Sequence, residues 1–191
     1  MNTTSVITTK EKLNPKYFAL LVGCTSIVMM FTAFTSAYIV RQSGGNWLEF
    51  KLPHIFTYST IVLITSSIFL HFSYISFKRL NEISYKVFLV LSVFLAFFFL
   101  YLQYQGWLQM QAEGVSLNGN PSGSFVYVIS GVHAAHIIGG IAALLMAVVH
   151  AFMLDFFTSE KRINRFKMVL TYWHFVDIIW IYLFIFFNVQ R

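Results

Sequence analysis

Long apolar runs separated by short polar segments dominate the pattern of this chain. Each run is long enough to cross a bilayer as a helix, which takes about 20 residues. The runs cover approximately 17–40, 54–77, 87–107, 125–153 and 168–189. The segments between them carry polar and turn-forming residues. The pattern predicts an all-α integral membrane bundle of five transmembrane helices over 17–189, preceded by a polar segment over 1–16.

The composition supports a membrane environment. The 191 residues are 58% hydrophobic and only 10% charged, with a mean hydropathy of +0.69. A soluble domain could not bury so much apolar surface, so lipid must solvate most of the chain. The single cysteine, Cys24, excludes an internal disulfide and a thiolate-rich metal site. The polar start and the length of the first run argue against a cleaved signal peptide.

The basic residues predict the orientation of the bundle. Ten of the 13 fall on the side of the N-terminus: Lys10, Lys12, Lys16, Lys78, Arg79, Lys86, Lys161, Arg162, Arg165 and Lys167. The other three, Arg41, Lys51 and Arg191, fall on the opposite side. The positive-inside rule then places the N-terminus in the cytoplasm and the C-terminus outside. This distribution accounts for the basic charge without a nucleic-acid partner.

Two pairs of polar residues interrupt the last two apolar runs. His133 and His136 are three residues apart in the fourth run, and His174 and Asp177 repeat that spacing in the fifth. Residues three apart lie near one face of a helix. Small residues also recur every fourth position in the fourth run, which allows another helix to approach closely. This small-residue stripe consists of Gly131, Ala135, Gly139, Ala143 and Ala147.

The residues alone leave three interpretations of the polar pairs open. Histidines on two helices could ligate a haem or, with Asp177, a metal ion. They could also form a proton path, although Asp177 is the only acidic residue within the five runs. The third interpretation is structural: Asp177 and His174 pair with His133 or His136 between the last two helices. It is favoured because an unpaired charge in hydrocarbon is costly.

Four stretches, in order and spacing, resemble the cytochrome c oxidase subunit III family. YWHFVDIIWIYLF is similar to the family's last transmembrane helix, and SGVHAAHIIGG resembles its [ST]-G-x-H-x-x-H segment. FTSAYIVR looks like the helix end with an A-Y-x-x-R stretch, and LPHIFTYSTIVLITSSIFLH resembles the helix after it. The resemblance covers approximately Tyr17 to Asn188. Of the four stretches, YWHFVD is the specific one.

The resemblance implies a non-catalytic core subunit of a proton-pumping haem–copper terminal oxidase. Such a subunit binds no haem or copper itself; haem a and copper belong to its partners, subunits I and II. It packs against subunit I, holds phospholipid, and supports proton uptake and durable turnover. Further small subunits or a respiratory supercomplex are expected partners, in a bacterial inner membrane. Five helices look like the short bacterial form. The same family serves quinol oxidases, so the electron donor stays open.

The resemblance also bears on individual residues. His174 and Asp177 match the family motif and would be structural, with Trp173 and Trp180 packing beside them. One departure concerns the first helix, where many family members carry a glutamate associated with proton uptake. The corresponding stretch here is GCTSIVMMFTAF, which has no acid and places Thr25, Ser26 or Ile27 near that position. A direct proton role for this helix is therefore in doubt.

Overall fold

The computed structural model describes residues 15–190, and these residues form five α-helices and no strand. The helices are α1 (Pro15–Gln42), α2 (Ile55–Lys78), α3 (Glu82–Ala112), α4 (Pro121–Met153) and α5 (Glu160–Val189). By length and composition, each of the five could cross a membrane. The expected all-α, five-helix architecture is thus confirmed. The expected polar segment over 1–16 lies almost wholly outside the described residues.

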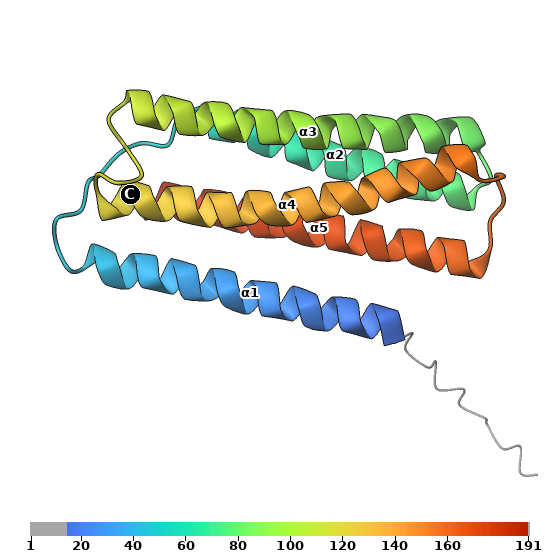
Figure 1. Cartoon of the computed structure of the whole chain (residues 1–191), viewed down its shortest axis with the longest axis horizontal. Coiled ribbons are helices and arrows are strands. Elements are labelled where there is room, and N and C mark those ends of the chain that lie inside the picture. The colour runs from blue at the N-terminus through green and yellow to red at the C-terminus, as the bar shows by residue number, and fades with distance from the viewer. Residues whose placement is uncertain (1–14, 191) are drawn as a thin grey trace, which may run out of the picture.

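Four of the helices form a bundle, and α1 lies along the edge of that bundle. Helices α2 to α5 run side by side, whereas α1 packs only against α4 and α5 (Figure 1). The most extensive contact is between α2 and α3, which a three-residue turn joins. Antiparallel neighbours with short connections are the expected arrangement for a helical membrane bundle.

The loops gather at two ends of the bundle, and the basic residues divide between them. One end holds the start of α1, the turn 79–81 and the segment 154–159 (Figure 1). We call it the basic end, because eight described basic residues are near it: Lys16, Lys78, Arg79, Lys86, Lys161, Arg162, Arg165 and Lys167. Only Arg41 and Lys51 are described near the opposite end. The cytoplasmic location of the basic end stays a prediction.

Polar caps make the helices longer than the apolar runs. Asn81 Oδ1 accepts the Ser84 N–H at 3.2 Å at the start of α3. Ser159 Oγ accepts the Arg162 N–H at 3.3 Å at the start of α5. Each cap satisfies a backbone N–H that has no partner within the helix. Helix α5 consequently begins eight residues before the apolar run at 168.

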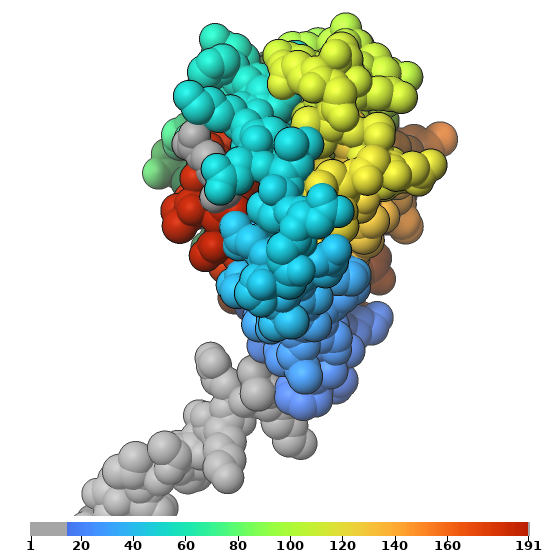
Figure 2. Space-filling view, turned by 90° about the vertical axis from the view of Figure 1, so that its left-hand side faces the viewer, coloured from blue at the N-terminus to red at the C-terminus, as the bar shows by residue number. Residues whose placement is uncertain are grey.

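Asn120 caps α4 and also fixes the long segment 43–54. Its Oδ1 accepts the backbone N–H of Ser122 at 3.0 Å and that of Leu48 at 3.2 Å. Its Nδ2 donates to the carbonyl of Asn46 at 3.0 Å. Figure 2 views the molecule from the end opposite the basic end and shows the segment 43–54 (cyan) lying beside the start of α4 (yellow). One amide side chain therefore bonds two connections that are far apart in the sequence.

Two glycines permit the closest helix contacts. A Cβ on Gly106 would lie 2.8 Å from Phe56 Cε2, and a Cβ on Gly140 would lie 2.9 Å from two ring carbons of Trp173. Real Cβ atoms are not found so close to other heavy atoms. The indoles of Trp173 and Trp180 are fully buried at the centre of the bundle. Glycine thus provides the space in which large aromatic rings pack between helices.

Candidate functional site

His133 lies at the point where four helices meet. Its ring stacks on the indole of Trp180, with centroids 4.9 Å apart and an interplanar angle of 28°. The rings of Phe31 and Phe99 meet it edge-on at 6.2 and 6.1 Å. His133 is fully buried, and neither of its ring nitrogens has a hydrogen-bond partner within residues 15–190. The imidazole therefore serves as an aromatic packing element between α1, α3, α4 and α5.

His136 makes its polar contacts locally. Its Nδ1 lies 2.8 Å from the carbonyl of Val132, one turn back on α4. The Tyr172 hydroxyl of α5 donates to the backbone carbonyl of His136 at 3.2 Å. The polar link between α4 and α5 at this level is thus made by a tyrosine, and the His136 ring does not take part in it.

His174 and Asp177 face α2. Ser67 Oγ lies 2.5 Å from His174 Nδ1, and the rings of His71 and His174 are 5.7 Å apart. Asp177 lines the same cleft as Ser67 and His174. This cleft is on the outer face of the bundle, and we call it the α2–α5 cleft. Its lining consists of Ile64, Ser67, Ile68, His71, Phe72, His174 and Asp177.

The pairing expected between the two polar pairs is not present in the structure. His174 and Asp177 contact α2, whereas His133 and His136 lie on α4 among aromatic rings and their own backbone. The reason is helical phase. Successive residues are about 100° apart around a helix, so His174 faces a different neighbour from the buried Trp173. The spacing fixed which residues share a face, but not which helix that face meets.

The small-residue stripe also differs from its expected place. Ala135 and Gly139 are exposed on α4. A Cβ on Gly131 would meet nothing within 4 Å, and one on Gly139 would meet only the Tyr172 hydroxyl, at 3.8 Å. The close contact with α5 is made by Gly140, which is not a member of the stripe. The stripe therefore faces outward over part of its length.

The described residues offer no set of metal ligands. Within residues 15–190, no three His, Cys, Asp or Glu side chains are arranged to hold a metal ion. His71, His174 and Asp177 line one cleft but are not among such a set. The cofactor interpretation of the histidines thus has no ligand geometry to support it in this part of the chain.

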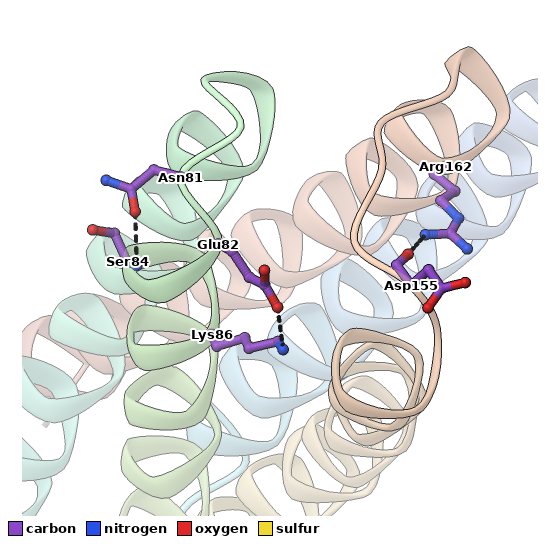
Figure 3. Close-up of polar contacts among 6 residues, drawn as sticks. All are labelled: Asn81, Glu82, Ser84, Lys86, Asp155 and Arg162. Carbon is purple, nitrogen blue, oxygen red and sulfur yellow. Dashed lines mark hydrogen bonds and ion pairs between the residues drawn. The ribbon is translucent and has the colours of Figure 1, made fainter.

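A second hollow lies at the basic end, between α4 and α5. This α4–α5 cavity has a volume of about 310 Å³. Its inner wall is apolar, and His150, Asp155, Arg162 and Arg165 are at its rim. Arg162 Nη1 donates to the Asp155 carbonyl at 2.7 Å (Figure 3). This hydrogen bond joins the start of α5 to the connection between α4 and α5. Arg165 is exposed and makes no ion pair within the described residues.

Two hydroxyl residues of α2 belong to the site, although they were not among the candidate residues selected from the sequence. Thr60 Oγ1 accepts the indole N–H of Trp180 at 2.9 Å, and Ser67 contacts His174. Both lie in an apolar run, where serine and threonine commonly hydrogen-bond to their own helix backbone. The sequence shows that both residues are on α2, but it does not show which helix they would face.

The fold and its polar contacts define a multi-pass helical membrane protein whose ionisable groups lie within helix contacts. The profile of the family "Cytochrome c oxidase subunit III" matches residues 18–190. A probable cytochrome c oxidase subunit 3 of Mycobacterium bovis is 29% identical over 170 residues, which cover 86% of this chain and 82% of that protein. The cytochrome bo(3) ubiquinol oxidase subunit 3 of Buchnera aphidicola is 28% identical over 178 residues, 91% and 93% of the two chains. This chain belongs to the cytochrome c oxidase subunit III family.

Membership gives the chain its biochemical setting. It is subunit III of a haem–copper oxidase, a multi-pass membrane protein that associates with other oxidase subunits. The resemblance of the four stretches is thereby confirmed at the level of the family.

Proposed function

We propose that this chain is a non-catalytic core subunit that packs against the haem–copper subunit I, beside subunit II, in a bacterial inner membrane. Haem a and copper would reside on those partners. The family match over residues 18–190 carries the proposal. It is supported by the polar residues of the family motif, which lie within helix contacts and not in a ligand set. In this role the chain prolongs and steadies turnover of the oxidase.

Lipid retention is the second part of the proposed function. The α4–α5 cavity combines an apolar wall with a cationic rim at the basic end. A phospholipid matches this division, because its acyl chains fit the wall and its phosphate attracts Arg165. Asp155 at the same rim opposes an anion and limits how strongly it is held. The cavity would therefore bind lipid with moderate strength, between the last two helices.

Support of proton uptake is expected to be indirect. Helix α1 has no acidic residue, and its hydroxyl side chains near the expected position are engaged locally. Thr25 Oγ1 donates to the Leu21 carbonyl at 3.0 Å, and Ser26 Oγ donates to the Val22 carbonyl at 3.2 Å. These hydroxyls offer no continuous path through the membrane. We infer that the chain helps proton uptake by stabilising its partners.

A quinol oxidase is the second candidate for the assembly. The Buchnera relative is a subunit of a ubiquinol oxidase, and its 28% identity to this chain is the same as that of the cytochrome c oxidase subunit 3 of Corynebacterium diphtheriae. The cytochrome c and quinol enzymes would differ in the electron donor, which binds elsewhere in the complex.

Affinity purification of the tagged chain from its native membrane in mild detergent tests the proposal. We expect the other oxidase subunits to co-purify and the visible spectrum to show haem a. Mass spectrometry then identifies the sequence of the co-purified subunit II. Copper-binding residues in that sequence would indicate a cytochrome c oxidase, and their absence would indicate a quinol oxidase. Purification of the chain alone, with stoichiometric haem of its own, would overturn the proposal.

A further inference from the structure

The α2–α5 cleft presents polar groups where hydrocarbon is expected. Asp177 lies ten residues beyond Lys167, about 15 Å along the helix axis. Ser67 lies eleven residues before Lys78, about 16 Å along its own axis. The cleft is thus near the middle of a bilayer about 30 Å thick. It opens outward, because Ile68 and Phe72 at its edge are exposed.

The polar groups of the cleft are only partly satisfied within the chain. Asp177 is 7% exposed, and its Oδ1 has no hydrogen-bond partner among the described residues. The single hydroxyl of Ser67 is engaged with His174 Nδ1. His71 makes a ring contact with His174 but no hydrogen bond within residues 15–190. His71 is exposed on the outer face of the bundle. A polar side chain that faces hydrocarbon is strongly disfavoured, so a polar partner from a neighbouring subunit would stabilise this face.

We propose that the α2–α5 cleft receives a transmembrane helix of another oxidase subunit, which places a side-chain hydroxyl or amide against the polar groups that line the cleft, the exposed His71 and the Asp177 carboxylate. Acyl chains carry no hydrogen-bonding groups and cannot satisfy a carboxyl. A hydroxyl or an amide both donates and accepts, so it fits this carboxyl whether it is ionised or protonated. Such side chains commonly link helices in membranes. Ile64, Ile68 and Phe72 provide apolar walls against which the incoming helix packs.

This inference rests on the proposed function, because family membership supplies the neighbouring subunits. It adds the surface and the chemistry of the contact. All residues that line the cleft come from the middle of α2 and α5. A lipid that fills the cleft is the alternative occupant.

Photocrosslinking in the intact complex tests the inference in the native sequence background. A photoreactive amino acid replaces Ile68, which is 48% exposed at the edge of the cleft, and a second sample carries it at Phe94 on α3. We expect Ile68 to crosslink to another oxidase subunit in high yield. Crosslinks from Ile68 only to lipid, or none while the other subunits co-purify, would overturn the inference and leave the proposed function intact. Failure of any oxidase subunit to co-purify with the native chain would overturn both.

Two substitutions at one position provide an independent measurement. Asp177→Leu preserves the size of the side chain and removes its polar atoms, whereas Asp177→Asn retains them. We expect Asp177→Leu to reduce the amount of co-purified partner subunits about tenfold, as loss of one buried hydrogen bond implies. Asp177→Asn should stay within about twofold of the native chain, because an amide can meet a hydroxyl or amide partner. Equal retention by both variants, at equal expression, would contradict a polar contact.

Discussion

The indole of Trp180 joins two neighbours at once: its face stacks on His133, and its N–H donates to Thr60 Oγ1 at 2.9 Å. His133 belongs to α4, Thr60 to α2 and Trp180 to α5. A single fully buried side chain therefore fixes the relative rotation of three helices. In lipid, where hydrophobic burial does not drive helix association, packing and interhelical hydrogen bonds provide the specificity.

Substitution of Trp180 should measure how much this arrangement contributes. We expect Trp180→Ala to lower the free energy of unfolding by about 3–5 kcal/mol, because it leaves a large cavity. Trp180→Phe should cost about 1–2 kcal/mol, since it retains a ring but loses the bond to Thr60. Ile178→Ala is the control, because Ile178 is exposed on the same helix. Thermal unfolding of the purified complex in detergent ranks the stability of the three variants. A loss of stability for Ile178→Ala as large as that for Trp180→Ala would contradict the prediction.

Adjacent glycines on α4 provide a matched pair for the close contact with α5. A Cβ on Gly140 would overlap the ring of Trp173, whereas one on Gly139 meets only the Tyr172 hydroxyl at 3.8 Å. We expect Gly140→Ala to destabilise the chain by about 1–3 kcal/mol through overpacking. Gly139→Ala should be close to neutral or slightly stabilising, because alanine is the better helix former. Comparison of the two unfolding temperatures decides the matter; equal values would show that the helices can separate at little cost.

The contrast between these glycines shows what the sequence could predict. Five spanning helices followed directly from the length of the apolar runs, whereas the caps at Asn81, Asn120 and Ser159 lie in the polar segments before those runs and were not predicted. The rotation of each helix about its own axis could not be predicted from the apolar pattern. All five helices are apolar around most of their circumference, so the pattern does not distinguish a face that meets lipid from one that meets a helix.

The polar pairs show the same limit. The spacing of His174 and Asp177 predicted correctly that they share a region of α5, and Asp177 was expected to need a partner. The partner was assigned to α4, but α2 contacts this face and Ser67 is the nearest hydroxyl. Helix α5 contacts both α4, its neighbour in the sequence, and α2, which is distant in the sequence. Only the three-dimensional arrangement decides which of the two neighbours a given side chain meets.

Asn120 offers a test of the link between two connections. Its side chain caps α4 and bonds the segment 43–54 through Asn46 and Leu48. We expect Asn120→Ala to lower the free energy of unfolding by about 1–2 kcal/mol, the upper range for loss of a cap. Asn118→Ala is the control, since Asn118 is an exposed asparagine of the same connection. Limited proteolysis within 43–54 should accelerate for Asn120→Ala only; faster cleavage in both variants would mean that the side-chain bonds do not hold the segment.

Leu80 occupies a backbone conformation that suits glycine. Its φ is +59°, at the end of α2, where the Asn81 N–H donates to the Ser76 carbonyl at 3.0 Å. This bond is typical of a helix end with a left-handed residue, which costs an L side chain about 1–2 kcal/mol. We expect Leu80→Gly to stabilise the chain by about 0.5–1 kcal/mol, after the greater freedom of glycine in the unfolded chain is subtracted. Ile83→Gly, within α3, should instead destabilise it by about 1 kcal/mol. A lower unfolding temperature for Leu80→Gly would show that the exposed leucine makes a compensating contact in the complex.

The rim of the α4–α5 cavity permits a test of lipid retention in which two substitutions have opposite signs. Arg165→Gln should reduce retained anionic phospholipid about tenfold, because it removes a charge-assisted hydrogen bond to the phosphate. Asp155→Asn should increase retention, because it removes a negative charge from the same rim. Lys161→Gln controls for general attraction to anionic lipid, since Lys161 carries the same charge but does not line the cavity. Native mass spectrometry after a graded detergent wash counts the lipids on each variant. Equal losses for Arg165→Gln and Lys161→Gln would indicate a diffuse surface effect, whereas a loss confined to Arg165→Gln would locate the phosphate at the cavity.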